Sequence, residues 1–240
     1  MAGPVCIIGA MDEEITEFLS HADVSKVVER KFFRIHEASL FDSPVIIVKC
    51  GVGKVFASLI TQHVIDAYHP SSVISTGVAG SLSETFSIGD VVVSTDCAHH
   101  DMDVRALGFE RGRIPFTDLR FFRADENLVR SALTGRLESA GHKIMAGRIL
   151  TGDQFMSGNH RETHGHLTGE FDGHAVDMES AAIAQVCFVN ETAFVSIRTI
   201  SDNADHNAHV DFNQFLPVVV SNSFQVVKGI LGDWRGYVSE

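Results

Sequence analysis

The sequence predicts an α/β fold in which a mixed β-sheet lies between layers of helices. Short apolar runs rich in β-branched residues alternate with longer helix-like stretches, and this alternation is typical of a sheet covered by helices. A chain of 240 residues with 45% hydrophobic content can bury a large core, and α/β chains of this length commonly form one domain. We therefore expect residues 1–240 to form a single domain.

The apolar runs have the length and composition of strands that are buried on both faces. The predicted strands are Val5–Gly9, Val45–Cys50, Val73–Val78, Val91–Thr95, Ile144–Thr151 and Phe194–Ile200. The predicted helices are Lys54–Ala67, Asp125–Ala140, Glu179–Val189 and Phe212–Leu231. The segment Phe32–Cys50 predicts two strands joined by a turn at Phe41–Pro44, and such a hairpin makes the sheet mixed.

Charge and hydropathy exclude several classes of partner. The formal net charge is -12 and no run is rich in Lys or Arg, which argues against a nucleic acid or an anionic membrane surface as the main partner. No stretch approaches the roughly 20 apolar residues that span a bilayer, and the first ten residues lack the pattern of a secretory signal. We expect a cytoplasmic protein whose partner is a small molecule.

Neither the cysteines nor the histidines predict a disulfide, a metal or a cofactor. His160, His164 and His166 cluster in the polar stretch Ser157–Gly173, which predicts a surface loop without any zinc signature. The cysteines are widely spaced within or beside apolar segments, which is typical of buried, reduced thiols. They are Cys6, Cys50, Cys97 and Cys187.

Three acidic residues that are far apart in the sequence meet the expectation of acids near the ends of the predicted strands. Glu14 follows the first strand, Asp202 follows the last, and Glu179 precedes a helix. Ligands of open α/β sheets bind at the carboxyl ends of strands. Cleaving a bond between a sugar carbon and a purine nitrogen requires an acid, stabilisation of a cationic sugar and a positioned nucleophile. These acids could supply that chemistry, or each could only cap a turn or a helix.

Six motifs, taken together and in this order, resemble those of the methylthioadenosine/S-adenosylhomocysteine nucleosidases. They are IGAMDEE at 8–14, CGVGK at 50–54, HDMDV at 100–104, TGDQF at 151–155, VDME at 176–179 and RTISD at 198–202. The resemblance covers nearly the whole chain. It implies a three-layer, phosphorylase/hydrolase-like sandwich and hydrolysis of the N-glycosidic bond of 5′-methylthioadenosine and S-adenosylhomocysteine.

The resemblance also implies roles for individual polar residues. Asp202 would protonate the purine at N7 with help from Ser201, since a buried carboxyl holds its proton more readily. Glu14 would activate the attacking water, and Arg198 would hold the charges of the site in place. Glu179 would bind the ribose hydroxyls and stabilise the developing cation.

The remaining implied contacts are largely apolar. Phe155 would stack on adenine, the backbone of Met156 would read the edge of the base, and the backbone of Met178 would help to bind ribose. A 5′ slot and a homodimer are also implied, with the last two of the following residues reaching into the neighbouring subunit. The residues implied are Met11, Val52, Val104, Phe212, Leu107 and Pro115. All of these apolar side chains could instead be ordinary core.

The nucleophile site distinguishes a hydrolase from a phosphorylase. Phosphate binding needs arginines, hydroxyls and free backbone amides, whereas the first loop carries Asp12, Glu13 and Glu14, whose charges would repel phosphate. The stretch 75–78, which reads STGV, also lacks the arginine and the serine with which the phosphorylases bind phosphate there. Val78 stands where many nucleosidases have serine, which puts one hydrogen bond to water or ribose in doubt, and Asp177 replaces the more usual glutamate.

Three alternatives stay open. The substrate could be another adenine nucleoside, such as aminodeoxyfutalosine, or the enzyme could be a purine nucleoside phosphorylase. A nucleoside-binding protein without activity is the third, and the presence of both Glu14 and Asp202 argues against it because binding requires neither an acid nor a base.

Overall fold

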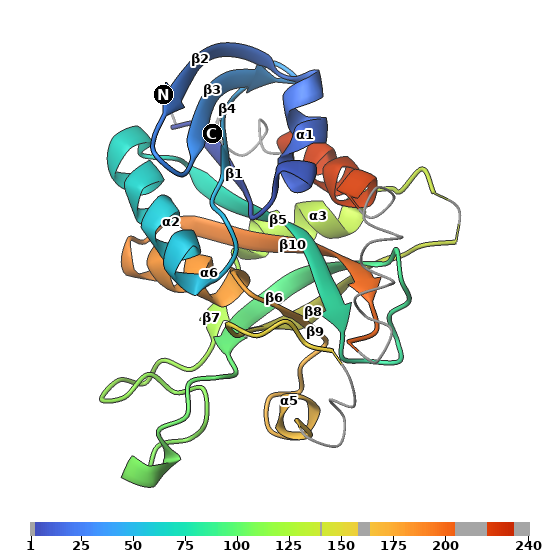
Figure 1. Ribbon diagram of the computed structural model, residues 1–240. Coiled ribbons are helices and arrows are strands. Elements are labelled where there is room, and N and C mark those ends of the chain that lie inside the picture. Colours follow the sequence, from blue (N-terminus) through green and yellow to red (C-terminus); the bar gives the residue numbers. More distant parts are fainter. Residues whose placement is uncertain (1–2, 140, 158–163, 205–219, 233–240) are drawn as a thin grey trace.

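The computed structural model describes residues 3–139, 141–157, 164–204 and 220–232. Figure 1 shows a twisted sheet with helices on both faces, as predicted. The strands are β1 (Val5–Gly9), β2 (Asp23–Glu29), β3 (Arg34–Leu40), β4 (Ser43–Lys49), β5 (Ser72–Ser81), β6 (Val91–His99), β7 (Phe122–Arg123), β8 (Ile144–Thr151), β9 (Ala175–Asp177) and β10 (Ala193–Asp202). The helices are α1 (Asp12–His21), α2 (Lys54–Tyr68), η1 (Arg105–Leu107), α3 (Glu126–Thr134), α5 (His166–Gly169) and α6 (Ser180–Val189). Residues 220–232 are also helical.

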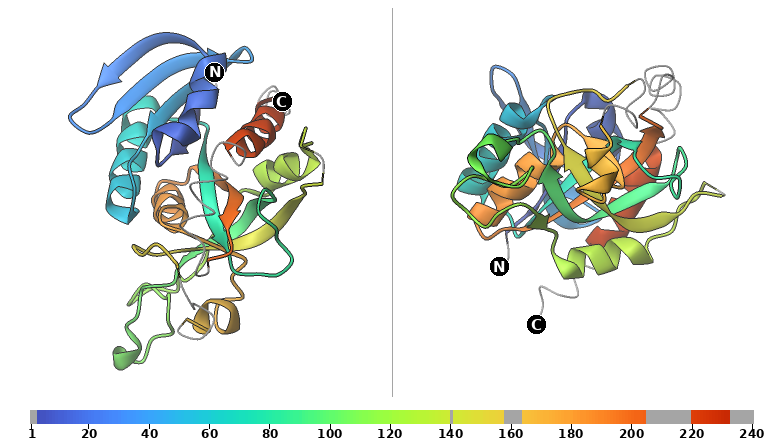
Figure 2. Two further views of the ribbon diagram at one scale, coloured as in Figure 1. Left: turned by 45° about the vertical axis from the view of Figure 1, so that its right-hand side comes forward. Right: turned by 90° about the horizontal axis from the view of Figure 1, so that it is seen from below.

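Two apolar cores, one on each face of the sheet, explain the continuous hydrophobic strands. Cys6 and Ile8 of β1 pack into the core beneath α2 and α6, whereas Val5 and Ile7 pack into the core beneath α1, α3 and the helix at 220–232. Successive side chains of a strand point to opposite faces, so a strand covered on both sides must be apolar throughout. The three-layer arrangement is therefore confirmed (Figure 2).

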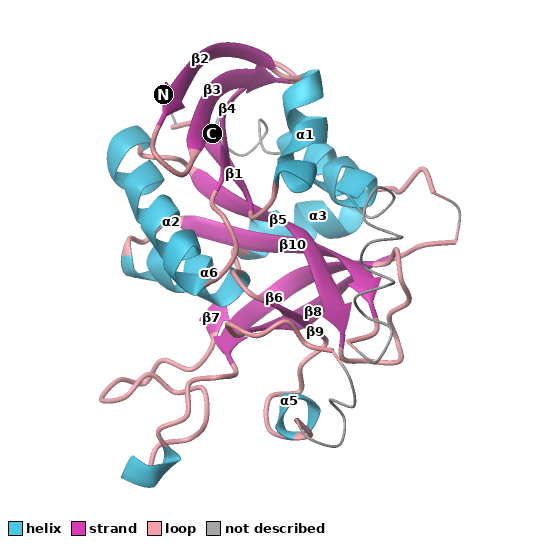
Figure 3. Ribbon diagram, viewed as in Figure 1, coloured by secondary structure: helices cyan, strands magenta, loops and turns pink. Residues whose placement is uncertain are grey.

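The sheet is mixed and part of it closes on itself. The strand order is β10-β6-β8-β9-β5-β1-β4-β3-β2, and β10 also pairs with β5. The strands β5, β10, β6, β8 and β9 therefore form a closed ring, from which β1, β4, β3 and β2 extend as an open sheet (Figure 3). This closure gathers the carboxyl ends of β5, β8, β9 and β10 close to that of β1.

The strand predictions agree closely with the structure, and the differences have local causes. Strands β1 and β8 have the predicted bounds, and the hairpin of β3 and β4 is confirmed. The helix expected over Asp125–Ala140 ends at Thr134, because Gly135 follows it and glycine is a poor helix former. Strand β2 was not predicted, since as an exposed edge strand it lacks an apolar run.

The remaining expectations concern the membrane, the cysteines and the last helix. Within the described ranges, no helix is long and apolar enough to cross a membrane. All four cysteines are buried and free, as predicted. Of the helix expected over Phe212–Leu231, the residues before 220 lie outside the described part of the chain.

Candidate active site

One cavity of about 210 Å³ lies at the carboxyl ends of β1, β5, β9 and β10. Most of the residues predicted for the site line it, although they come from segments far apart in the sequence. These residues are Met11, Glu14, Val52, Val78, Phe155, Met156, Met178, Glu179, Ser201 and Asp202. The acids at the three predicted strand and helix ends thus converge around one space.

Glu14 is fixed by backbone N–H groups from two elements. Its Oε2 accepts hydrogen bonds from the N–H of Ala10 at 2.6 Å and of Met11 at 3.0 Å, and its Oε1 accepts one from Val78 of β5 at 3.1 Å. The Met11 bond caps α1, as in a capping box, but the Val78 bond reaches outside the helix. A Cβ at Gly77 would collide with the Glu14 carboxylate, so β5 needs glycine there to let Glu14 approach.

The electrostatic environment of Glu14 combines burial with compensation. Glu14 is only 5% exposed. Burial raises the pKa of its carboxyl above the usual value, because desolvation disfavours the charged form. The charge of Arg198 and the three backbone N–H donors oppose this shift. A carboxylate held in this way can act as an acceptor for a proton inside the cavity.

Glu179 occupies the N-cap position of α6, yet its side chain makes no capping hydrogen bond. The interpretation of Glu179 as a simple helix cap is therefore wrong. Its Oε1 instead accepts a hydrogen bond from the N–H of Gly53 at 2.8 Å. Burial and then the nearby charge of Asp177 raise the pKa of Glu179 above its ordinary value, against the opposing effect of Arg198.

Asp202 is aimed into the cavity by an irregularity in β10. The register of β10 against β5 shifts between Ile200 and Asp202, so Asp202 pairs with Gly80, and such bulges redirect side chains next to active sites. The Oδ2 atom accepts a hydrogen bond from the Ser201 hydroxyl at 2.8 Å, and Oδ1 accepts one from the N–H of Ala204 at 2.8 Å. Asp202 thus caps the turn that follows and also lines the cavity.

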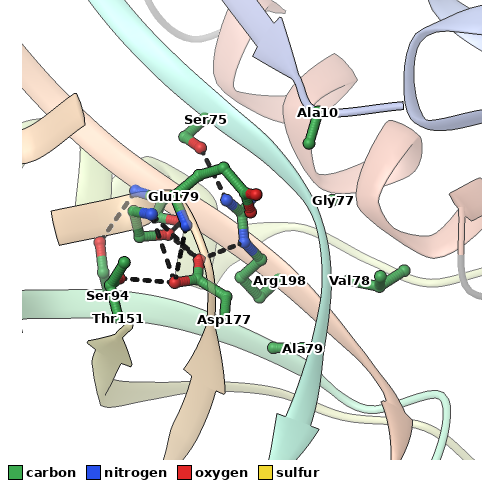
Figure 4. A network of polar contacts seen from close by, with 12 residues as sticks. Ala10, Ser75, Gly77, Val78, Ala79, Ser94, Thr151, Asp177, Glu179 and Arg198 are labelled. Atoms are coloured by element: carbon green, nitrogen blue, oxygen red, sulfur yellow. Dashed lines mark hydrogen bonds and ion pairs between the residues drawn. The ribbon is translucent and has the colours of Figure 1, made fainter. Parts of the chain in front are cut away.

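Arg198 lies beneath the cavity, where Asp177 holds it. Its Nε donates to Asp177 Oδ2 at 2.8 Å and its Nη2 donates to Ser75 Oγ at 3.0 Å, with both ends of the ion pair almost fully buried. Asp177 also accepts hydrogen bonds from Thr151 Oγ1 at 2.5 Å and from Ser180, as Figure 4 shows in part. The Nη1 atom of Arg198 has no hydrogen-bond partner within the described residues.

The apolar part of the cavity contains side chains that sequence reasoning could have assigned to the core. Phe155 is 46% exposed and lines the cavity, so the interpretation of Phe155 as ordinary core is wrong. Met156 is buried beside it, whereas Val52 is largely exposed at the cavity edge. Together they give the cavity an apolar wall.

Some predicted residues do not line this cavity. Val104, Leu107 and Pro115 belong to the segment 103–119, which includes η1 and projects from the body of the protein (Figure 1). Leu107 is 68% exposed. Phe212 lies outside the described residues, so its role stays a prediction.

The histidine-rich stretch Ser157–Gly173 also lies only partly within the described residues. His160 is not among the described residues, while the rings of His164 and His166 lie 5.7 Å apart, centroid to centroid. Within the described ranges, no group of three or more His, Cys, Asp or Glu side chains has an arrangement that could hold a metal ion.

Sequence reasoning assigned no role in the cavity to several lining residues, and four of these are apolar residues or glycine, which carry no chemical signal. They are Ala10, Ala79, Gly80, Gln154, Val176 and Asp177. Ala10, Gln154, Val176 and Asp177 stand inside the quoted motifs, and Ala79 and Gly80 follow Val78, so these positions in the chain were the available signal. Asp177 was noted only as a departure from the usual glutamate, and its five-donor environment depends on tertiary contacts.

Comparison with known proteins decides the family. The model of the phosphorylase superfamily matches residues 4–232. The 5′-methylthioadenosine/S-adenosylhomocysteine nucleosidase of Haemophilus ducreyi is 40% identical over 231 residues, which cover 95% of this chain and 97% of that protein. The chain belongs to this nucleosidase family of the phosphorylase superfamily. The resemblance seen in the sequence motifs is thereby confirmed.

Solved structures of the superfamily agree with this assignment. The nucleosidase of Colwellia psychrerythraea, solved in complex with adenine, has a TM-score of 0.90 and 35% sequence identity, covering 97% of this chain and 96% of that one. The futalosine hydrolase of Helicobacter pylori has a TM-score of 0.89 and 31% identity, covering 97% and 99%. The nucleosidase fold predicted from the motifs is therefore confirmed.

Proposed function

We propose that this nucleosidase hydrolyses the N-glycosidic bond of 5′-methylthioadenosine and S-adenosylhomocysteine, releasing adenine and a 5-thio-substituted ribose. The observation that carries this proposal is the convergence of Glu14, Glu179 and Asp202 around one cavity with an apolar wall. The curated relatives bear the name of this activity. The cationic group nearest these acids, Arg198, is engaged by Asp177.

The proposed reaction uses two of the acids for proton transfer. Asp202 donates a proton to N7 of the base while the bond between the sugar carbon and the purine nitrogen breaks, and Ser201 orients its carboxyl group. Water attacks the sugar carbon and gives a proton to Glu14, which the backbone N–H groups hold in place. Positioned acids and bases of this kind contribute about 10²–10⁴-fold each.

Glu179 binds the ribose hydroxyls in this proposal, together with the backbone of Met178. The carboxyl oxygens of Glu179 accept hydrogen bonds from the ribose hydroxyls. Burial raises the pKa of Glu179 in the free protein, whereas Arg198, the Gly53 N–H and the positive charge that develops on the sugar favour its ionised form. The negative charge also stabilises the positive charge that develops on the sugar. The positive charge of Arg198 offsets the repulsion between the neighbouring carboxylates. Its effect in lowering the pKa of both Glu14 and Glu179 supports this role.

The base and the 5′ group occupy the apolar wall. Phe155 stacks on adenine and the backbone of Met156 binds the edge of the base, while Met11, Val52 and Val78 line the sugar and 5′ side. Val78 has no side-chain hydroxyl, so its polar contribution is its backbone N–H, which donates a hydrogen bond to Glu14.

A homodimer completes the 5′ pocket in this proposal. Leu107 is 68% exposed, and Val55 and Leu59 of α2 are 76% and 52% exposed. Exposed apolar surface of this kind is typical of an interface. Leu107 and Pro115 would then cover the 5′ substituent across the interface. The four buried free cysteines support a reducing compartment, the cytoplasm, as the location.

The decisive experiment incubates purified protein with 5′-methylthioadenosine in phosphate-free buffer and measures free adenine and reducing sugar. We expect adenine release that added phosphate does not accelerate, because the acids of the first loop leave no cationic cradle for phosphate. A strict requirement for phosphate, with a sugar 1-phosphate as product, would identify a phosphorylase instead.

A second substrate class has one specific observation in its favour. The likeness to the Helicobacter pylori futalosine hydrolase is nearly as high as that to the methylthioadenosine nucleosidases. The same assay with aminodeoxyfutalosine as a competing substrate gives the ratio of the two kcat/KM values. We expect 5′-methylthioadenosine to have the higher value.

A further inference from the structure

An ion pair at the edge of the cavity joins three loops that each follow a different strand. Lys54, the first residue of α2, places its Nζ 2.7 Å and 2.6 Å from the two carboxylate oxygens of Asp101. Asp101 lies beyond the end of β6, and the side chains of Lys54 and Asp101 are 22% and 32% exposed. Neither residue lines the cavity itself.

Two further hydrogen bonds connect this ion pair to the loop after β8. The N–H of Asp153 donates to Asp101 Oδ2 at 3.1 Å, and Asp153 Oδ1 in turn accepts the N–H of Lys54 at 2.9 Å. Lys54, Asp101 and Asp153 thus form a closed polar triangle, in which each residue bonds the other two. Phe155 and Met156 lie two and three residues after Asp153 in the chain.

The triangle also fixes the peptide that holds Glu179. Gly53, adjacent to Lys54, has a φ of 97°, a conformation that favours glycine, and its N–H donates to Glu179 Oε1 at 2.8 Å. The bond from the Lys54 N–H to Asp153 anchors the next peptide. One polar cluster therefore supports both the aromatic wall and one of the acids.

The electrostatics of Asp101 show that the triangle is more than a surface ion pair. Burial raises the pKa of Asp101, but the bonds from Lys54 and from the Asp153 N–H outweigh that effect and hold the pKa below its usual value. The carboxylate is therefore ionised at neutral pH, and it accepts three hydrogen bonds from two donors on the other two loops, Lys54 Nζ and the Asp153 N–H. Charge-assisted bonds of this kind are stronger than neutral ones.

We propose that Lys54 and Asp101 are positioning residues that hold the loop of Asp153 to Met156 at the distance from Glu179 that an adenine nucleoside requires. This inference rests on the proposed function, because it assigns Phe155 and Met156 to the base. The ion pair touches no substrate and acts through Gly53 and Asp153. Misplacing a binding group by about 1 Å can cost up to 10²-fold in activity.

The test compares Lys54→Met, Asp101→Asn and the double variant with the wild-type enzyme. We expect each single change to raise both KM for 5′-methylthioadenosine and Kd for free adenine on the order of tenfold, while kcat changes by less than threefold. The double variant should be no worse than either single variant, because residues in one network are not additive. Lys54→Arg should retain most of the affinity, since it keeps the charge.

Lys26→Met is the matched control. Lys26 forms an ion pair of the same kind with Glu37, at 2.7 Å, between β2 and β3 and away from the cavity, so its loss should leave KM and the adenine Kd unchanged. Thermal unfolding of every variant separates positioning from stability: a fall in Tm without a change in KM or Kd would overturn the proposal. Effects that multiply in the double variant would overturn it too.

Failure of the proposed function gives a different result. If the wild-type enzyme releases no adenine, the assigned reaction is wrong. If it does release adenine and Lys54→Met binds adenine as well as wild type does, the reaction stands and the positioning role is wrong.

Discussion

The cavity rim and the projecting segment 103–119 are built on opposite principles. At the rim, Glu14, Glu179 and Asp202 are almost fully buried, and each accepts a hydrogen bond from at least one backbone N–H group of the same chain. On the segment, Leu107 is 68% exposed and Phe116 is 87% exposed. The three acids are thus positioned within one chain, whereas our proposal assigns the apolar cover of the 5′ group to a second chain.

The largest expected effect is a loss of kcat when the general acid of the cavity rim, Asp202, is replaced. Asp202→Asn should lower kcat for 5′-methylthioadenosine by about 10²–10⁴-fold, the usual contribution of a general acid, because an amide has no proton to donate at neutral pH. The fold should persist, since Asn can still accept the hydrogen bond from the Ala204 N–H. Adenine release and thermal unfolding measure the two effects, and retained turnover would remove Asp202 as the acid.

A smaller effect is expected on the projecting segment. Leu107→Ser should raise KM for 5′-methylthioadenosine on the order of tenfold, because an apolar contact with the 5′ group is lost. Its Tm should barely change, since Leu107 is exposed in the single chain.

Leu133→Ser serves as the control for Leu107→Ser. Leu133 is 40% exposed on α3, in the opposite helical layer, and its loss should leave KM unchanged. Sedimentation velocity should show a dimer for the wild-type enzyme. A monomer with the wild-type KM would contradict the shared pocket.

The smallest expected effect concerns the pH dependence of stability and sharpens the role of burial at the rim. Burial and Asp177 raise the pKa of Glu179 in the folded state to about 8, from 4.5. Between about pH 4.5 and pH 8, the folded protein therefore holds a proton on Glu179 that the unfolded chain has lost. The free energy of unfolding has its full contribution from this group below about pH 4.5 and loses it as the pH rises towards 8. Glu179→Gln cannot ionise and does not undergo this loss.

The difference in Tm between Glu179→Gln and the wild-type protein should therefore grow in favour of the variant from pH 5 to pH 8. A change of about 1 kcal/mol in the free energy of unfolding shifts Tm by roughly 2–4 °C for a chain of this size. Glu13→Gln, which changes an exposed acid one residue from Glu14, should show no such trend in thermal unfolding scans. A Tm difference independent of pH would show that Glu179 is not a buried acid of raised pKa.

The sequence alone predicted the mixed sheet, most of the strands and ten of the residues that line the cavity. Strands buried on both faces require continuous apolar runs, so Val5–Gly9 and Ile144–Thr151 were visible as such. Glu14 and Asp202 were recognisable because each follows an apolar run, at the end where ligands bind, and Glu179 because it lies in a motif just before a helix. Strand β2 escaped prediction because an exposed edge needs no apolar run.

Only the tertiary structure decided how these residues are held. The bulge that pairs Asp202 with Gly80, the N–H groups of Val78 and Gly53 that bind Glu14 and Glu179, and the triangle through Asp101 all join residues distant in sequence. Periodicity and composition record which side chains must be buried, because burial depends on apolar surface. They do not record which donor meets which acceptor, because hydrogen bonds depend on distances and angles that exist only once the ring of strands has closed.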